Sequence, residues 1–259
     1  MDLRSATQCV HERSRMAFAA AARAGLAGEF RVFEHGGLLV QFTTSPGLGF
    51  LSTVTGATAD SLAVLPGVLA EARAVGAPAP VVVTADTGLT ERLHRLGFEP
   101  AGQRVLGIMS LSAPAAAPSP ATSAAHHITE AVTAAERQVF LGTLAAGYAG
   151  APELTRFIVT EHAELAVRGF VAWRGSEPAG AAAFWLHDRV AVIGGAATMP
   201  AARGTGVQAA LLRHRLRQAI EAGATAAVVT AAAGSASARN LARAGFVLHR
   251  GERWRYQPG

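Results

Sequence analysis

Two patterns of apolar and polar positions recur along the chain, and each predicts a different kind of element. Continuous apolar runs, such as Val190 to Ala197 and Thr225 to Ala231, are typical of buried strands. Between these runs, apolar side chains recur at helical spacing from Ala209 to Ala222, which predicts an amphipathic helix. Strand, helix and strand in this order predict an α/β fold with a mixed sheet.

The same patterns predict elements in both halves of the chain. In the first half we expect an amphipathic helix within 1–28, a helix at 60–75, and strands at 82–85 and 104–111. In the second half we expect helices at 133–144, 152–166 and 206–222, and a short helix from 235 that ends in Gly-Phe at 245–246. Strands are expected there at 127–131, 169–174, 179–187, 190–199, 225–231 and 246–256.

The turn Thr198–Gln208 is the strongest functional signal. It joins a predicted strand to a predicted helix, so the unpaired N–H groups of the helix start face outward. Gly204 and Gly206 let the backbone approach a ligand closely, and Arg203 adds a full positive charge to the helix dipole. This combination favours binding of a diphosphate.

Two familiar phosphate motifs are excluded at this turn. A Walker loop needs a lysine, and the chain contains none. A dinucleotide fingerprint needs a glycine at position 209, where alanine stands.

The two halves of the chain contain similar motifs in the same order. Val-Val-Thr-Ala at 82–85 is followed by a Gly-Phe at 97–98, and the same tetrapeptide at 228–231 is followed by a Gly-Phe at 245–246. An Ala/Pro/Ser-rich stretch separates the halves and reads as a semi-rigid linker. The matching order and spacing indicate an internal repeat.

The second half resembles the GNAT superfamily of N-acyltransferases over about residues 127–256. The acyl-CoA loop of that family, Arg/Gln-x-x-Gly-x-Gly/Ala, is matched by Arg203-x-x-Gly206-x-Gln208, with Gln208 in place of a small residue. The resemblance implies two tandem GNAT-like domains: a degenerate copy at 1–112, a linker at 113–126 and an acyltransferase domain at 127–259. In the first copy the corresponding turn has no arginine and contains Asp60, which would repel a diphosphate but could cap a helix.

The family resemblance also implies how acetyl-CoA or another acyl-CoA would bind as co-substrate. Backbone groups of Thr198 and Met199 would pair with the pantetheine arm as an added strand, and an amide near Ala196 or Ala197 would polarise the acyl carbonyl. The expected CoA contacts are Thr198, Met199, Arg203, Gly204, Thr205, Gly206, Val207, Gln208 and Asn240.

The residues that move protons are less clear from the sequence. Many family members carry a tyrosine four residues before the glycine of the Gly-Phe, but here that position is Leu241. Tyr148, in a loop between two predicted helices, and Ser237 are the candidate acids, although Ser237 could instead cap its helix together with Ser235. A thiolate could also leave without assistance.

A general base could come from the helix predicted at 152–166. His162 with Glu161 is our first candidate, and a solvated polar helix face is the alternative. No spacing of His, Asp or Glu supports a metal site, so no metal is expected.

Composition narrows the class of protein. Half of the residues are hydrophobic and 16% are charged, enough for a substantial core. The formal net charge of +5 could suggest nucleic acid, but the arginines are spread along the chain, so a nucleic-acid partner is not favoured. The single cysteine, Cys9, excludes a disulfide framework and is compatible with the cytoplasm. No apolar run reaches the ~18–20 residues of a membrane helix, and the charged N-terminal helix does not resemble a signal peptide.

Together these features predict an acyl-CoA-dependent N-acyltransferase, with acetyl as the default acyl group. Transfer to a small-molecule amine would be direct, because no activated nucleophile is visible. Two alternatives stay open: a catalytically decayed acyl-CoA-binding or sensing protein, and a related transferase that uses another acyl carrier such as aminoacyl-tRNA. The sequence does not indicate the oligomeric state.

Overall fold

The computed structural model describes residues 1–111 and 126–257, so the predicted linker lies outside the described residues except for His126. The chain divides into two compact units that are not successive segments. Unit 1 contains Ile108–Val229 and Asn240–Val247, together with Met1, and unit 2 contains Asp2–Gly107, Thr230–Arg239 and Leu248–Gly259. The end of the chain therefore belongs to the same unit as its N-terminal half. The fold class is α/β with a mixed sheet, as the sequence predicts.

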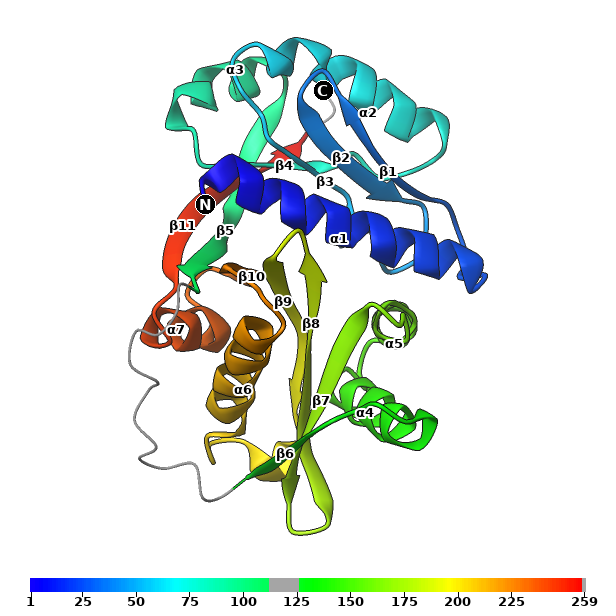
Figure 1. The fold of residues 1–259 in the computed structure, drawn as a ribbon. Coiled ribbons are helices and arrows are strands. Elements are labelled where there is room, and N and C mark those ends of the chain that lie inside the picture. The colour runs from blue at the N-terminus through cyan, green and yellow to red at the C-terminus, as the bar shows by residue number, and fades with distance from the viewer. Residues whose placement is uncertain (112–125, 258–259) are drawn as a thin grey trace. The chain divides into compact units, whose positions relative to one another are not determined.

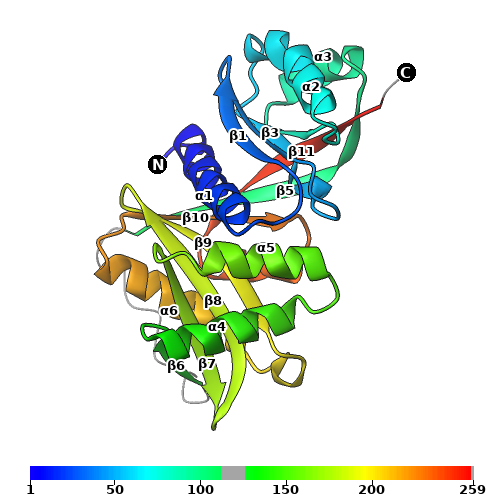
Figure 2. The same ribbon diagram turned by 90° about the vertical axis from the view of Figure 1, so that its right-hand side faces the viewer.

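Unit 1 is built on strands in the order β10-β9-β8-β7-β6, which are antiparallel except for the parallel pair β9 and β10. Its helices α4 and α5 lie on one side of β7, β8 and β9, and α6 lies on the other (Figures 1 and 2). The elements are β6 (His127–Glu130), α4 (Ala134–Gly147), α5 (Pro152–His162), β7 (Val167–Arg174), β8 (Glu177–His187), β9 (Val190–Thr198), the 3-10 turn η4 (Pro200–Ala202), α6 (Val207–Glu221) and β10 (Ala226–Ala232).

Local sequence explains where the helices of unit 1 begin and end. Helix α4 begins at a capping box, in which Thr133 and Glu136 satisfy each other's backbone N–H groups. Helix α5 begins with Pro152, whose missing N–H is harmless in the first turn. At the other end of α5, the Arg137 guanidinium donates to the carbonyls of His162, Ala163 and Glu164.

Unit 2 has strands in the order β1-β2-β3-β4-β11-β5, in which β3 and β4 are parallel and the pairs β1-β2, β2-β3 and β4-β11 are antiparallel. Both units thus contain three consecutive antiparallel strands, β1-β2-β3 and β7-β8-β9, followed by a parallel one, and unit 1 has β6 as a further antiparallel strand. The elements of unit 2 are α1 (Leu3–Arg23), β1 (Phe30–His35), β2 (Leu38–Thr43), η1 (Gly49–Leu51), β3 (Thr53–Thr55), η2 (Ser61–Val64), α2 (Leu65–Ala74), β4 (Val81–Thr84), η3 (Thr87–Leu89), α3 (Thr90–Arg95), β5 (Phe98–Ser110) and β11 (Val247–Tyr256). Helix α7 (Ala236–Arg243) and strands β5, β10 and β11 are each divided between the units.

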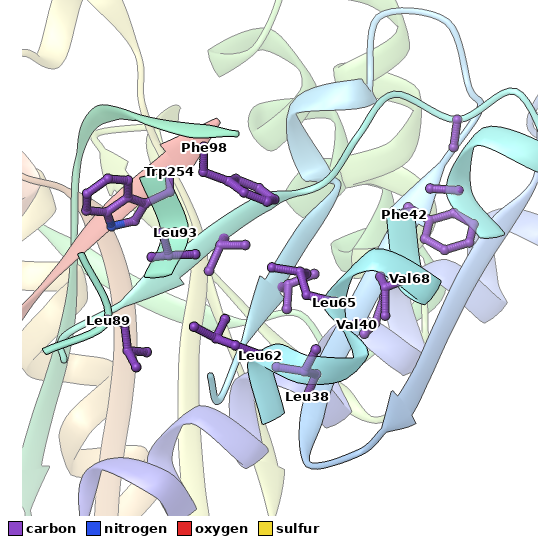
Figure 3. Packing of buried hydrophobic residues seen from close by; sticks show 14 residues of the cluster. Leu38, Val40, Phe42, Leu62, Leu65, Val68, Leu89, Leu93, Phe98 and Trp254 are labelled. Carbon is purple, nitrogen blue, oxygen red and sulfur yellow. The ribbon is translucent and has the colours of Figure 1, made fainter. Parts of the chain in front are cut away.

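The core of unit 2 joins distant parts of the chain. Every second side chain of β2 points to the same face of the strand. On this face lie Leu38, Val40 and Phe42, which pack with side chains of α2 (Figure 3). Phe98 at the start of β5 and Trp254 on β11 complete the same cluster (Figure 3). Trp254 is the register partner of Val82 on β4, which explains why the last strand contributes to this core.

One predicted element of unit 2 begins later than expected. The helix predicted at 60–75 divides into η2 and α2, and α2 begins at Leu65. Asp60 makes no side-chain capping bond, because its backbone is already helical. Thr58 and Ser61 exchange the hydrogen bonds that close this turn instead. The prediction that Asp60 caps the helix is therefore wrong.

None of the described helices has the length and hydropathy that a bilayer-spanning helix needs.

Two phenylalanines in unit 2 offer a matched test of this core. Phe98 is fully buried, whereas Phe50 in η1 is 54% exposed. We expect Phe98→Ala to lower the free energy of unfolding by about 3–5 kcal/mol, because it removes buried apolar area and leaves a cavity. Phe50→Ala should change it by no more than about 0.5–1 kcal/mol. Urea denaturation of both variants measures the difference, and equal effects would contradict the placement of Phe98.

Candidate active site

The turn between β9 and α6 leaves a helix N-terminus open to solvent. Gly204 and Gly206 have positive φ values of 78° and 84°, which only glycine adopts without strain. Gly206 is the N-cap of α6 and provides no side chain, so nothing caps the helix. The first intrahelical bond runs from the Ala210 N–H to the Gly206 carbonyl. The N–H groups of Val207, Gln208 and Ala209 therefore have no acceptor within the helix.

Positive charge surrounds this open helix start. Arg203 is exposed, and its guanidinium forms no ion pair or hydrogen bond with the rest of the described chain. Arg174 donates to the Ala201 carbonyl at 3.3 Å, and Nε2 of His126 lies 3.0 Å from the Thr205 carbonyl. Neither contact could be foreseen, because these residues are remote from the turn in sequence. Free N–H groups, a helix dipole and arginine side chains form an anion site.

Gln208, the departure from the family loop pattern, is held by its neighbours. Its Oε1 accepts from Asn240 Nδ2 at 2.7 Å, and Asn240 Oδ1 accepts from the Arg243 guanidinium at 2.8 Å. These bonds direct the Gln208 side chain toward α7. The bulk of Gln208 is thereby anchored to one side of the helix start.

The edge of β9 beyond Ile193 is open on the β10 side. Its parallel pairing with β10 ends at Ile193↔Val229. On the β8 side, the Met199 N–H donates to the Ala179 carbonyl, and the Met199 carbonyl accepts from Ala202. Both backbone groups of Met199 are therefore used, and the predicted role of Met199 in pairing with pantetheine needs correction. The alternation of an antiparallel ladder turns the backbone groups of Thr198 away from β8, so they stay available for the pairing that the sequence predicts.

A bulge interrupts β9 next to this open edge. Ala181 on β8 faces Ala197, but Ala183 faces Gly194, so two steps on β8 match three on β9. On β9, Gly195 and Ala196 have no register partner on β8. Gly195 takes up the distortion with a positive φ of 53°. The bulge thus re-aims the backbone near Ala196, where the sequence predicts an amide that polarises the acyl carbonyl.

Helices on both sides of the sheet are fitted to this bulge. From α4, Gly147 approaches so closely that any side chain at this position would overlap the Ala197 Cβ. From α6, the buried Arg215 donates one guanidinium nitrogen to the carbonyls of both Ala183 and Gly194, at 3.0 and 3.1 Å.

Tyr148 lies at the same bulge. It is the C-cap of α4, and its hydroxyl contacts the Ala196 carbonyl at a long 3.5 Å. The Tyr148 carbonyl accepts from the Thr155 hydroxyl, which ties the loop to α5. Of the two predicted acids, Tyr148 is therefore the one that reaches the backbone expected to bind the thioester.

Glu161 and His162 are buried behind the bulge. They are 6% and 1% exposed, so the alternative of a solvated helix face is wrong for both residues. His162 Nδ1 lies 2.8 Å from the Ile158 carbonyl, which can only accept, so Nδ1 carries the hydrogen. A methyl group at position 195 would overlap His162 Nε2. His162 therefore packs where Gly195 lacks a side chain.

The remaining candidate acid, Ser237, is not part of unit 1. Ser237 falls in the segment of α7 that belongs to unit 2, and no hydrogen bond of its side chain is seen. Ser235 caps this helix instead, through its bond from the Ala238 N–H. Leu241, at the usual tyrosine position, is buried.

Comparisons with known proteins agree with this geometry. Residues 137–246 match the family model of the acetyltransferase (GNAT) family. The chain contains a GNAT acetyltransferase domain. The matched segment includes the bulge, the open edge of β9 and the α6 turn, so the protein carries a transferase domain of this family.

Solved structures share the fold of the chain beyond the GNAT domain. A GCN5-related N-acetyltransferase from Kribbella flavida is 19% identical, with 95% of this chain and 96% of that chain covered and a TM-score of 0.61. One from Sphaerobacter thermophilus is 15% identical, with 86% and 78% covered and a TM-score of 0.64. A tandem GNAT protein from the clavulanic acid biosynthesis pathway is 14% identical, with 93% and 86% covered and a TM-score of 0.60. No curated protein matches the chain in sequence.

No cluster of three or more His, Cys, Asp or Glu side chains is placed to hold a metal ion in the part of the chain that the structure describes.

The fit between His162 and the bulge of the GNAT domain can be tested with two glycines of similar backbone conformation. Gly195 and Gly175 have φ values of 53° and 61°, but only Gly195 has a neighbour within reach of a new side chain. Alanine at either position costs roughly 1–2 kcal/mol of backbone strain. We expect Gly195→Ala to cost a further 1–3 kcal/mol or so, because the methyl group meets His162. Thermal or urea unfolding compares the two variants, and equal losses would mean that His162 yields without cost.

Proposed function

We propose that the protein is an acyl-CoA-dependent N-acyltransferase that transfers an acetyl group to a small-molecule amine. The observation that carries the proposal is the uncapped start of α6, with Arg203 unpaired beside it. The pyrophosphate of CoA would accept from the N–H groups of Gly204 and of Gly206 to Gln208 and pair with Arg203, whereas the Thr205 N–H already donates to the Ala202 carbonyl. Thr198 would pair with the pantetheine arm along the open edge of β9.

The transfer itself is direct in this proposal. The neutral amine nitrogen attacks the thioester carbon, the C–N bond forms, the C–S bond breaks, and the amine loses a proton while the CoA thiolate gains one. The bulge at Gly195 and Ala196 would present a backbone amide to the acyl oxygen, where negative charge develops. The Tyr148 hydroxyl is the proposed proton donor to the thiolate.

We assign His162 to support of the bulge rather than to proton transfer, with the Glu161 carboxylate 3.6 Å from its Nδ1. Both are buried, and His162 packs against the Cα of Gly195. A base that takes a proton from an incoming amine needs a path to it, directly or through one water molecule. A deprotonated amine could instead be selected from solution.

We infer that the first half of the chain, residues 1–112, is a degenerate copy of the domain at 127–259. The support is a shared strand direction: β1-β2-β3 and β7-β8-β9 are antiparallel, and each set is followed by a parallel strand. The turn that matches the α6 start is closed on itself, since the Thr58 N–H donates to Ser61 Oγ and the Ser61 N–H to Thr58 Oγ1. With its donors already satisfied, this turn has little to offer an anion.

The proposal predicts one acetyl-CoA site per chain, measured by isothermal titration calorimetry. Arg203→Ala should weaken the affinity by about 1–3 kcal/mol, the contribution of a charge-assisted contact, or roughly 5- to 150-fold in Kd. Arg213→Ala is the matched control, because it removes the same charge from an exposed position on α6. Asp60→Ala in the closed turn should also leave the affinity unchanged.

The outcomes of this titration separate the alternatives. Two sites per chain would contradict the degenerate first half, and no binding at high concentration would contradict the acyl-CoA proposal. If acetyl-CoA binds but a panel of amines releases no CoA thiol, the protein is a binding or sensing protein, an alternative that the buried Leu241 favours. Salt-sensitive RNA binding without CoA binding would indicate another acyl carrier.

A further inference from the structure

Arg215 is a buried charged residue that has no role in the proposed pyrophosphate site between β9 and α6. It lies on α6, the helix that begins at the proposed pyrophosphate site, and it is 3% exposed. Its guanidinium donates to the Ala183 carbonyl on β8 and the Gly194 carbonyl on β9 at 3.0 and 3.1 Å, and its Nε lies 3.3 Å from the Leu211 carbonyl. These two strand residues face each other in the register immediately before the bulge.

Stability alone is a weak reason for an arginine at this position. Removal of a guanidinium from water is costly, and arginine cannot escape the cost by losing its proton. Leu211 and Leu212 on the same helix are buried without any charge.

The two carbonyls that Arg215 holds determine the geometry of the bulge. Gly194 C=O and Gly195 N–H belong to one peptide group, so an anchor on the carbonyl also fixes the direction of the N–H. A charged donor on that carbonyl polarises the peptide and strengthens its N–H as a donor. The anchor on Ala183 holds the β8 side of the same pair.

We propose that Arg215 is a positioning residue for acyl transfer. It sets the bulge in β9 so that the backbone N–H groups at Gly195 and Ala196 are aligned with the acyl oxygen. This inference rests on the proposed function. Arg215 acts through the backbone and touches neither acetyl-CoA nor the amine, in contrast to Arg203, which binds the pyrophosphate.

The test uses acetyl-CoA labelled with ¹³C at the thioester carbonyl, which needs no knowledge of the amine. Hydrogen bonds to the carbonyl oxygen shift this resonance downfield, so the bound wild-type protein should show a downfield displacement from free acetyl-CoA. Arg215→Met, which keeps much of the buried volume, should bind acetyl-CoA within about threefold of wild type and lose most of the displacement. Arg213→Met removes an exposed charge from the same helix and should keep both properties.

A second variant and a kinetic measurement sharpen the result. Arg215→Gln keeps a polar donor but no charge, so it should retain the fold if the methionine variant does not, with a smaller displacement than wild type. Once an amine acceptor is found, Arg215→Met should lower kcat about 10- to 100-fold and leave KM for acetyl-CoA nearly unchanged. A role confined to stability would move neither the resonance of the folded variant nor its kcat.

The outcomes distinguish this proposal from the proposed function. If wild-type protein does not bind acetyl-CoA, the proposed function fails and the role of Arg215 fails with it. If wild type binds and displaces the resonance, but folded Arg215 variants give the same displacement, only the role of Arg215 is overturned. A bound wild-type resonance at the position of free acetyl-CoA also overturns that role.

Discussion

The extra residue in β9 is the constraint on which the rest of the GNAT domain depends. A bulge leaves backbone groups out of the regular ladder, so contacts on the faces of the sheet help to define its geometry. On one face, Gly147 of α4 and His162 of α5 fit against the backbone at Ala197 and Gly195. On the other, Arg215 of α6 occupies two strand carbonyls. A side chain at Gly147 would overlap the Ala197 methyl group, and one at Gly195 would overlap the His162 ring.

The two halves of the chain share an arrangement of strands but differ in the turn that follows the antiparallel strands. In the first half three antiparallel strands precede a parallel one, and in the second half four do; in each, a helix start follows the last antiparallel strand. At 56–61, Thr58 and Ser61 satisfy each other's N–H groups. At 203–208, glycines provide the turn and leave the helix donors free. Free donors next to unpaired arginine are what an anion requires, so the proposal places acyl-CoA in the second half alone.

Much of this could be predicted from the sequence because it depends on local pattern. Local patterns predicted the strand at 190–198, the helix that follows it and the Arg203–Gly206 turn, because each is one continuous segment of the sequence. The contacts at the bulge join residues that are 21–50 positions apart, so Arg215 appeared as one arginine among several on a helix and Gly147 as part of a loop. The use of both Met199 backbone groups also depends on strand register, which periodicity does not reveal. Glu161 and His162 looked polar in sequence, but the fold buries them.

The replacement of the usual tyrosine by the buried Leu241 changes where catalytic power has to come from. A thiolate is a fairly good leaving group, since a cysteine-like thiol has a pKa of about 8.5, so a missing or distant acid is a modest handicap. The Tyr148 hydroxyl, at a long 3.5 Å from the Ala196 carbonyl, can only partly compensate in the arrangement seen here. Charge that builds up on the acyl oxygen is the larger demand, and fixed donors meet it without reorganisation. A domain without the usual acid should therefore depend more heavily on the alignment of its bulge, which gives the fixed geometry around Gly195 a catalytic purpose.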